Sequence, residues 1–219
     1  MKLLKRIAAL LFPPKCILCK RILEKDETDL CRSCRINAPI CPVSRQKLSF
    51  LDSWIAIWHY EEEVRGSILR FKFYGKRGYA RAYGRLPAMK LQQEHPDGFD
   101  LLTWVPTGIF RIMRRGYDQV KLLAEAVGTE LGMTPVPLLK KIRRTRTQST
   151  IRGDAHRRAN VLGAYKAIDP AQLSGKRILL LDDVITTGST AGECARILLT
   201  AGAKEVHCAA VARARHAKR

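Results

Sequence analysis

The chain has 219 residues, which corresponds to one domain of average size with a small addition. Hydrophobic residues make up 46% of it, so a sizeable core can form, and a disordered or fibrous chain is excluded. Lys and Arg number 40 against 20 Asp and Glu, and the formal net charge of +20 favours anionic partners: phosphates, nucleic acid or an anionic membrane surface.

Residues 3–12 are expected to form a short amphipathic helix. The apolar stretch there, residues 7–14, is far shorter than the roughly 20 residues that span a bilayer, so no transmembrane segment is predicted. Basic residues precede it as in a signal peptide, but no small-residue cleavage site follows. We therefore expect a packing helix rather than a membrane anchor, and a cytoplasmic protein.

The next segment is rich in cysteine. Two Cys-x-x-Cys pairs, Cys16 with Cys19 and Cys31 with Cys34, let four thiolates converge on one tetrahedral ion. In a cytosolic chain this spacing indicates zinc more often than disulfides or free thiols. We expect a closed structural zinc site without catalysis, and Cys41 stays open as a replacement for one ligand.

Strands and helices alternate from position 54 onward. Strands are expected at residues 54–60, 101–105, 137–142, 161–168, 178–181 and 205–212, and helices at 62–74, 79–93, 117–131 and 189–201. Pro87 is expected to kink or interrupt the second helix. Residues 143–158 lack apolar periodicity and are expected to form a long loop. The alternation predicts a parallel α/β sheet.

The clearest chemical signal lies at residues 178–190. An apolar strand delivers Asp182 and Asp183 to its carboxyl end, where open α/β sheets bind ligands, and Gly188 permits an unusual turn. Backbone N–H groups and hydroxyls then meet at a helix N-terminus and form a phosphate cradle. The cradle residues are Thr186, Thr187, Gly188, Ser189 and Thr190. Adjacent acids can accept hydrogen bonds from a cis-diol, so the segment predicts binding of ribose 5-phosphate; a capped tight turn would not explain two successive acids.

This segment resembles the phosphoribosyl pyrophosphate (PRPP) motif of type I phosphoribosyltransferases. The whole chain resembles the ComF family, also called GntX-like, whose members join a zinc module to a phosphoribosyltransferase domain and are associated with DNA uptake in natural transformation (competence). The landmarks are residues 12–16, both Cys pairs, residues 114–119, Thr147 with Gln148, Arg157 with Asn160, and residues 182–190. The resemblance implies an N-terminal helix and a small four-cysteine zinc module at 1–50, and a type I phosphoribosyltransferase-like parallel sheet flanked by helices at 51–219.

The resemblance also implies roles for individual residues. Asp182 and Asp183 would be catalytic and hold the ribose hydroxyls of Mg²⁺-bound PRPP, and residues 186–190 would bind its 5-phosphate. Arg114, Arg115 and Gly116 would approach the pyrophosphate, and residues 143–160 would include a mobile loop that closes over the site. The chain departs from the family pattern where Thr107-Gly108-Ile109 replaces a second Pro, where Asp118 replaces Asn, and where Cys41-Pro-Val-Ser44 lacks a second Cys.

Basic residues concentrate at 140–158, where only Asp154 opposes them. The arginines considered for the mobile loop and for DNA contact are Arg143, Arg144, Arg146, Arg157 and Arg158. Such a run can contact a nucleic-acid backbone; alternatively, the same arginines attract pyrophosphate or are solvated.

The functional hypotheses differ in whether turnover occurs. The first is a phosphoribosyltransferase, a glycosyltransferase with an unknown acceptor, that acts in DNA uptake. The second is a non-catalytic, PRPP-sensing, zinc-stabilised protein that binds single-stranded DNA and contacts proteins of the DNA-uptake machinery. A purely regulatory protein without nucleic-acid contact is a third.

Overall fold

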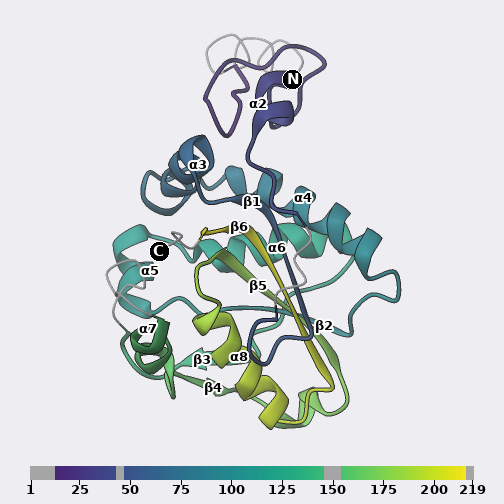
Figure 1. Cartoon of the computed structure of the whole chain (residues 1–219), viewed down its shortest axis with the longest axis vertical. Coiled ribbons are helices and arrows are strands. Elements are labelled where there is room, and N and C mark those ends of the chain that lie inside the picture. Colours follow the sequence, from purple (N-terminus) through teal and green to yellow (C-terminus); the bar gives the residue numbers. More distant parts are fainter. Residues whose placement is uncertain (1–12, 43–46, 146–153, 216–219) are drawn as a thin grey trace, which may run out of the picture.

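Four parallel strands form the central sheet (Figure 1). The computed structural model describes residues 13–42, 47–145 and 154–215, so the helix expected at 3–12 lies outside the described residues. The strands are β1 (Ser53–His59), β2 (Leu101–Trp104), β5 (Arg177–Ile185) and β6 (Glu205–Arg213). They stand in the order β1-β6-β5-β2, and every neighbouring pair is parallel. The predicted parallel sheet is confirmed.

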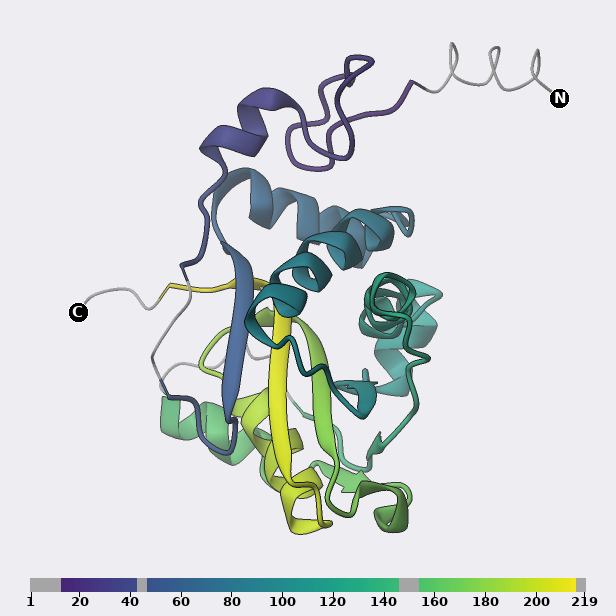
Figure 2. The ribbon, with the colours of Figure 1, turned by 90° about the vertical axis from the view of Figure 1, so that its right-hand side faces the viewer.

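Helices cover both faces of the sheet (Figure 2). The longer ones are α3 (Glu62–Phe73), α4 (Tyr79–Glu94), α6 (Gln119–Leu131) and α8 (Ser189–Thr200). Leu179 and Leu181 of β5 pack into one core with α3, α4 and α6, whereas Ile178 and Leu180 pack into a second core with α8. Both faces of β5 are buried, which is why its sequence is continuously apolar. None of the described helices is both long and apolar enough to cross a membrane.

A second, two-stranded sheet pairs β3 (Leu139–Lys141) with β4 (Tyr165–Ala167) in antiparallel fashion. Helix α7 (Asp154–Val161) precedes β4. The prediction of a loop over 143–158 is therefore wrong from residue 154 onward, and the strand expected at 161–168 begins only at Tyr165. Val161 is buried while Arg158 is exposed, so α7 offers too little apolar surface to show a helical period.

The described residues also form short elements that the sequence does not predict. They are α2 (Arg32–Asn37), α5 (Ile109–Arg115) and the 3₁₀ turn η2 (Pro170–Leu173). On α5, Ile109, Phe110 and Met113 are all more than half exposed, so no buried face announces this helix in the sequence. Helix α4 continues through Pro87 without interruption.

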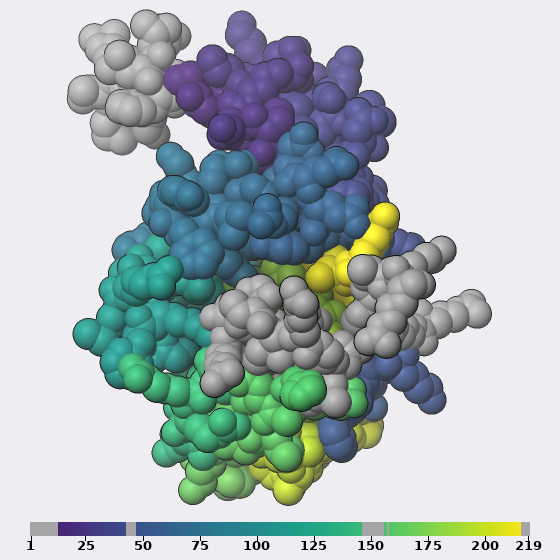
Figure 3. Space-filling view, turned by 60° about the vertical axis from the view of Figure 1, so that its left-hand side comes forward, coloured from purple at the N-terminus to yellow at the C-terminus, as the bar shows by residue number. Residues whose placement is uncertain are grey.

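The cysteine-bearing segment, residues 13–41, lies at one end of the molecule against α3 and α4 (Figures 1 and 3). Ile17 and Leu18 are buried in the core that contains α3. Leu48, further along, is buried in the core on the opposite face of the sheet. The division of the chain at residue 50 stays a prediction.

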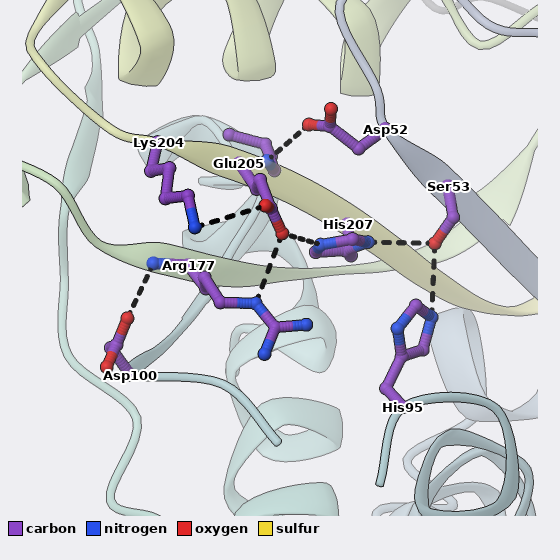
Figure 4. Close-up of polar contacts among 9 residues, drawn as sticks. Asp52, Ser53, His95, Asp100, Arg177, Lys204, Glu205 and His207 are labelled. Atoms are coloured by element: carbon purple, nitrogen blue, oxygen red, sulfur yellow. Dashed lines mark hydrogen bonds and ion pairs between the residues drawn. The ribbon is translucent and has the colours of Figure 1, made fainter. Parts of the chain in front are cut away.

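A network of polar contacts lies at the amino-terminal ends of β1, β5 and β6 (Figure 4). Ser53 at the start of β1 lies between His95 Nε2 at 3.1 Å and His207 Nδ1 at 2.9 Å. His207 Nε2 is 3.2 Å from a Glu205 oxygen, which also accepts from Arg177 Nε at 3.1 Å. The network joins β1, β5, β6 and the end of α4, and it lies at the end of the sheet opposite to the pocket described next.

Candidate functional site

A pocket of about 580 Å³ opens at the carboxyl ends of β2 and β5, as expected for an open parallel sheet. It brings together acids of β5, the start of α8 and basic side chains of α3, α5 and β3. The polar and charged residues of its lining include Asp182, Asp183, Thr186, Thr190, Lys72, Arg111, Arg114, Arg115 and Lys141. The acids of β5, the turn at Gly188 and the basic side chains therefore all face the same pocket.

Asp183 is the more firmly held of the two acids. It is 6% exposed, and its Oδ1 lies 2.7 Å from Lys72 Nζ while its Oδ2 accepts from Gln119 Nε2 at 3.0 Å. Burial alone would raise the pKa of this carboxyl, but the Lys72 ammonium and the Gln119 amide outweigh burial and lower it. Asp183 is therefore an ionised carboxylate whose charge is already compensated.

Asp182 points to the other side of the strand, because successive residues of β5 alternate between its faces. Its Oδ1 accepts from the backbone N–H of Asp183 at 2.8 Å. Burial, and then the charge of Asp183, raise its pKa to about 7. The prediction that the strand ends before the acids is wrong, since β5 continues to Ile185. The two acids still line one pocket, but with opposite pKa shifts.

The predicted phosphate cradle lies at the N-terminus of α8. Gly188 precedes the helix with a φ of +79°, a left-handed conformation that favours glycine, and a Cβ there would lie 2.9 Å from Leu48 Cδ1. The Thr187 and Ser189 hydroxyls bond each other at 2.6 Å, and Thr187 Oγ1 accepts from Ser189 N at 3.3 Å. Thr186, Gly188 and Thr190 line the pocket. The turn is thus braced by its own hydroxyls.

The predicted pyrophosphate residues are only partly brought to the pocket. Arg114 and Arg115 line it from α5, and their guanidinium carbons lie 6.0 and 4.8 Å from the centre of the Phe73 ring. Burial lowers the pKa of Arg115, and the neighbouring Asp183 charge opposes this shift. Gly116 ends α5 in a left-handed conformation and is not among the described residues of the pocket lining.

Thr107 and Asp118, two residues at which the chain departs from the family pattern, are joined by a hydrogen bond. The Asp118 side chain caps α6, and its Oδ1 accepts from the N–H groups of Val120 and Lys121. The same oxygen accepts from the Thr107 hydroxyl at 3.0 Å. The negative charge of Asp118 is therefore engaged at a helix N-terminus.

The sequence does not show which cations and which of their partners surround the two acids. Lys72 stands among exposed charges of an amphipathic helix, and Lys141 belongs to a short basic strand. Lys141 Nζ donates to Thr145 Oγ1 at 2.8 Å and to the Tyr165 hydroxyl at 3.3 Å, and burial lowers its pKa to about 8. Arg111 donates to the Thr145 carbonyl at 3.3 Å. Only the folded chain shows that these groups and Gln119 surround the acids.

The arginines of residues 143–158 have separate surroundings. Arg143 donates to the carbonyls of Asn160 at 3.1 Å and Leu162 at 2.9 Å, which ties the end of β3 to α7. The Arg144 guanidinium lies 3.5 Å from the centre of the Phe110 ring. Arg158 is exposed on α7. Arg146 and the side chain of Arg157 lie outside the described residues, so closure of a mobile loop stays a prediction.

Four cysteines form a cluster that can hold a metal ion. The Sγ atoms of Cys16, Cys19, Cys31 and Cys34 all lie within 4.8 Å of one another. Zinc–sulfur bonds of about 2.3 Å in a tetrahedron place sulfurs roughly 3.8 Å apart, so this donor set fits such an ion. Cys31 also caps α2, its Sγ accepting from Cys34 N at 3.4 Å. Cys41 lies outside this cluster, and its N–H donates to the Ile57 carbonyl at 2.9 Å.

The fold and the pocket define the class of protein. The family described as phosphoribosyl transferase domain matches residues 107–219, which include β5, α8, β6 and the pocket acids. The parallel sheet with flanking helices is the type I fold of that class, extended here by a cysteine cluster.

Relatives that match nearly the whole chain identify a particular family within this class. The chain is 28% identical to Competence protein F of Haemophilus influenzae, covering 91% of this chain and 97% of that protein. It is 30% identical to DNA utilization protein YhgH of Escherichia coli O157:H7, covering 87% and 86%, and 26% identical to Competence protein ComFC of Streptococcus pneumoniae, covering 88% and 96%. The chain belongs to the ComF-like family of competence proteins that carry a phosphoribosyl transferase domain.

Two solved structures match part of this chain. The glutamine PRPP amidotransferase of B. subtilis complexed with ADP and GMP is 22% identical with a TM-score of 0.44; the match covers 65% of this chain and 30% of that one. The phosphoribosylpyrophosphate synthetase of Mycobacterium smegmatis is 19% identical with a TM-score of 0.40, and the match covers 59% and 33%. The chain thus spans about a third of each.

Proposed function

We propose that this protein binds PRPP with Mg²⁺ in the cytoplasm and acts as a phosphoribosyltransferase in DNA uptake. The observation that carries the proposal is the composition of the pocket: two acids of β5, a hydroxyl-braced turn at the start of α8, and arginines of α5 face one space of about 580 Å³. These are the groups that a phosphorylated pentose with a pyrophosphate at C1 requires. The fit of the cysteine cluster supports a structural zinc ion as a second part of the proposal.

Each group has a distinct task in this mechanism. The N–H groups of residues 186–190 hold the 5-phosphate, and Asp182 and Asp183 accept hydrogen bonds from the ribose hydroxyls. Arg114 and Arg115 form charge-assisted contacts with the pyrophosphate and stabilise the charge that develops on it. Mg²⁺ bound together with PRPP would further neutralise the phosphate oxygens, and Asp182 and Asp183 are the carboxylates of the pocket lining that would face it.

The reaction then needs little covalent chemistry from the chain. The bond between C1 of the ribose and the pyrophosphate oxygen breaks, and pyrophosphate leaves with the bonding electrons. A nitrogen lone pair of the acceptor forms the new bond to C1, and the nitrogen loses a proton. Catalysis comes from positioning and from charge stabilisation of the leaving group.

Isothermal titration with PRPP and Mg²⁺ tests this proposal. The wild type is expected to bind, and the double variant Asp182→Asn, Asp183→Asn to lose at least about tenfold in affinity, since neutral amides replace both carboxylates that accept from the ribose hydroxyls. The control is Asp97→Asn, Asp169→Asn, which changes the net charge equally at two sites away from the pocket lining. Absence of binding by the wild type, or equal affinities of the two double variants, contradicts the assignment.

Turnover is tested separately by pyrophosphate release from PRPP in the presence of a panel of nitrogenous bases. Release that depends on one base identifies the acceptor. PRPP binding without any release favours the non-catalytic, PRPP-sensing alternative.

A second candidate function, binding of single-stranded DNA, is favoured by exposed side chains of α5 at the pocket wall. Phe110 and Met113 are 57% and 72% exposed beside the pocket arginines, and the Arg144 guanidinium stacks on the Phe110 ring. Exposed aromatic rings among arginines are the usual platform for stacked bases and a phosphate backbone. Contact with proteins of the DNA-uptake machinery is part of the same proposal.

This candidate predicts that Phe110→Ala weakens binding of a fluorescent single-stranded oligonucleotide at least about fivefold, because stacking on the ring is lost. Arg144→Ala should weaken it and also reduce its salt dependence. Fluorescence anisotropy across a salt series measures both effects. Arg81→Ala, an exposed arginine of α4, is the matched control. Equal losses in Arg81→Ala and Arg144→Ala would indicate only unspecific attraction by a basic protein.

A further inference from the structure

Helix α3 lies next to the cysteine-bearing segment (Figures 1 and 3), its middle contacts the first Cys-x-x-Cys turn, and its last turn lines the pocket. We use "Cys knuckle" for residues 16–19, the first Cys-x-x-Cys turn of the metal cluster. No sequence pattern connects this turn with the acids of β5, which lie far later in the chain. The structure connects them through side chains of one helix.

The middle of α3 holds the backbone of the Cys knuckle. The Ser67 hydroxyl donates to the Ile17 carbonyl at 2.5 Å. Arg70 NH2 donates to the same carbonyl at 2.9 Å and to the Leu18 carbonyl at 2.5 Å. Ile17 and Leu18 stand between the first two cysteines, so the path of the chain around the metal cluster determines where these acceptors lie.

The last turn of α3 forms part of the pocket wall. Leu69, Lys72 and Phe73 line the pocket, and Lys72 Nζ lies 2.7 Å from Asp183 Oδ1. The Lys72 side chain is 18% exposed, so this ion pair is shielded from water and sensitive to displacement. Phe71 is fully buried between the two contacts, and its carbonyl accepts from the Tyr117 hydroxyl.

The Cys knuckle has little regular structure to keep its shape without a metal ion. Its described neighbourhood contains isolated β-bridges and the short α2, and its apolar contribution to the core is mainly Ile17 and Leu18. In small sites of this kind, the free energy of metal binding is largely free energy of local folding. We therefore expect loss of the ion to weaken the contacts of Ser67 and Arg70 with these carbonyls, which would leave the buried Ser67 hydroxyl with the Tyr83 hydroxyl as its partner.

We propose that α3 couples metal binding at the Cys knuckle to ligand binding in the pocket, with Arg70 as the contact to the knuckle and Lys72 as the positioning residue for Asp183. The proposal rests on the proposed function for the identity of the pocket ligand. Linkage requires the effect to be reciprocal: zinc strengthens binding of the sugar phosphate, and the sugar phosphate strengthens binding of zinc by the same factor.

The first test measures zinc affinity by competition with a chromophoric chelator, with and without saturating ribose 5-phosphate. In the wild type, ribose 5-phosphate should raise the zinc affinity at least about fivefold. In Arg70→Met, the effect should fall below about twofold although zinc still binds, since the helix no longer follows the knuckle carbonyls. Lys72→Met should behave likewise, and Lys72→Arg should restore part of the effect because it retains the charge.

Arg85→Met is the matched control. Arg85 also attaches the cysteine-bearing segment, through a 2.9 Å ion pair with Asp29, but it does so from α4. If coupling passes through α3, Arg85→Met keeps the full effect of ribose 5-phosphate on zinc affinity. An equal loss of coupling in Arg70→Met and Arg85→Met, or full coupling in Arg70→Met, overturns the proposal.

The second test needs no pocket ligand. Hydrogen exchange of the wild type is compared before and after zinc removal by a chelator. The amides of residues 182–190 should exchange at least about tenfold faster in the metal-free protein, whereas those of η2 should be unchanged. Unchanged exchange at 182–190 overturns the coupling. Failure of ribose 5-phosphate to bind, combined with the expected exchange, instead contradicts the proposed function and leaves the coupling standing.

Discussion

Replacing Asp182 by Asn should stabilise the folded protein near pH 8. The pKa of Asp182 is raised to about 7 in the fold, mainly by burial. A carboxyl with a raised pKa binds its proton more tightly in the folded than in the unfolded chain, so it costs stability as the pH rises from about 4 through 7. Asn has no proton to lose, and a pKa raised from about 4 to about 7 makes the expected gain on the order of 4 kcal/mol near pH 8, shrinking toward zero near pH 4.

Asp183→Asn provides the comparison of opposite sign. Its pKa is lowered in the fold, because Lys72 and Gln119 outweigh burial, so its ionised form stabilises the protein at neutral pH, and this stabilisation is lost as the pH falls. Substitution leaves the Lys72 ammonium without its carboxylate and should cost about 3 kcal/mol at neutral pH. Thermal or urea unfolding of both variants across this pH range measures the two effects. Equal changes of the same sign would contradict the assignment of the two pKa shifts.

The same substitution of Asp182 should weaken binding of ribose 5-phosphate about tenfold near pH 8, since a carboxylate that accepts from hydroxyls is replaced by a neutral amide. A group that lowers stability and raises affinity is typical of a binding site rather than of a structural position. A variant that becomes more stable and binds equally well would show that Asp182 is only a buried acid outside the ligand contacts.

The sequence predicts the part of this site that lies on one strand and on the turn that follows it. The apolar run before Asp182, the paired acids and Gly188 follow one another directly, and each has a local physical reason. Even so, the sequence places both acids after the strand, whereas β5 includes them and sends them to opposite faces. Their opposite pKa shifts follow from that alternation and from Lys72, which no local pattern marks.

The remainder of the site depends on contacts between distant segments. Lys72 and Gln119 reach Asp183 from α3 and α6, and the pairing of Thr107 with Asp118 joins two departures that look unrelated in the sequence. Helix α5 is not predicted from the sequence, because its apolar side chains are exposed and do not form a buried face. Exposed apolar side chains do not help the chain to fold. One of these side chains, Phe110, lines the pocket.

Replacing Cys31 and replacing Cys41 should have different effects on the metal content of the protein, although both cysteines are buried. Cys31→Ser should lose the metal ion, because one of the four sulfur ligands is removed, while the serine hydroxyl still caps α2. Cys41→Ser should retain about one zinc per chain, because Cys41 lies outside the cluster although it is only 3% exposed. Elemental analysis of the purified variants measures metal content.

Stability distinguishes loss of the metal ion from the cost of placing a hydroxyl in the core. Metal-free wild type and Cys31→Ser should unfold at similar, lowered temperatures, with a loss on the order of several kcal/mol, because folding of the knuckle depends on the ion. Cys41→Ser should lose about 1–2 kcal/mol from the buried hydroxyl and should still respond to a chelator. If Cys41→Ser were metal-free and Cys31→Ser fully loaded, Cys41 would replace Cys31 as a ligand, and the zinc site would need a different arrangement of the segment that leads into β1.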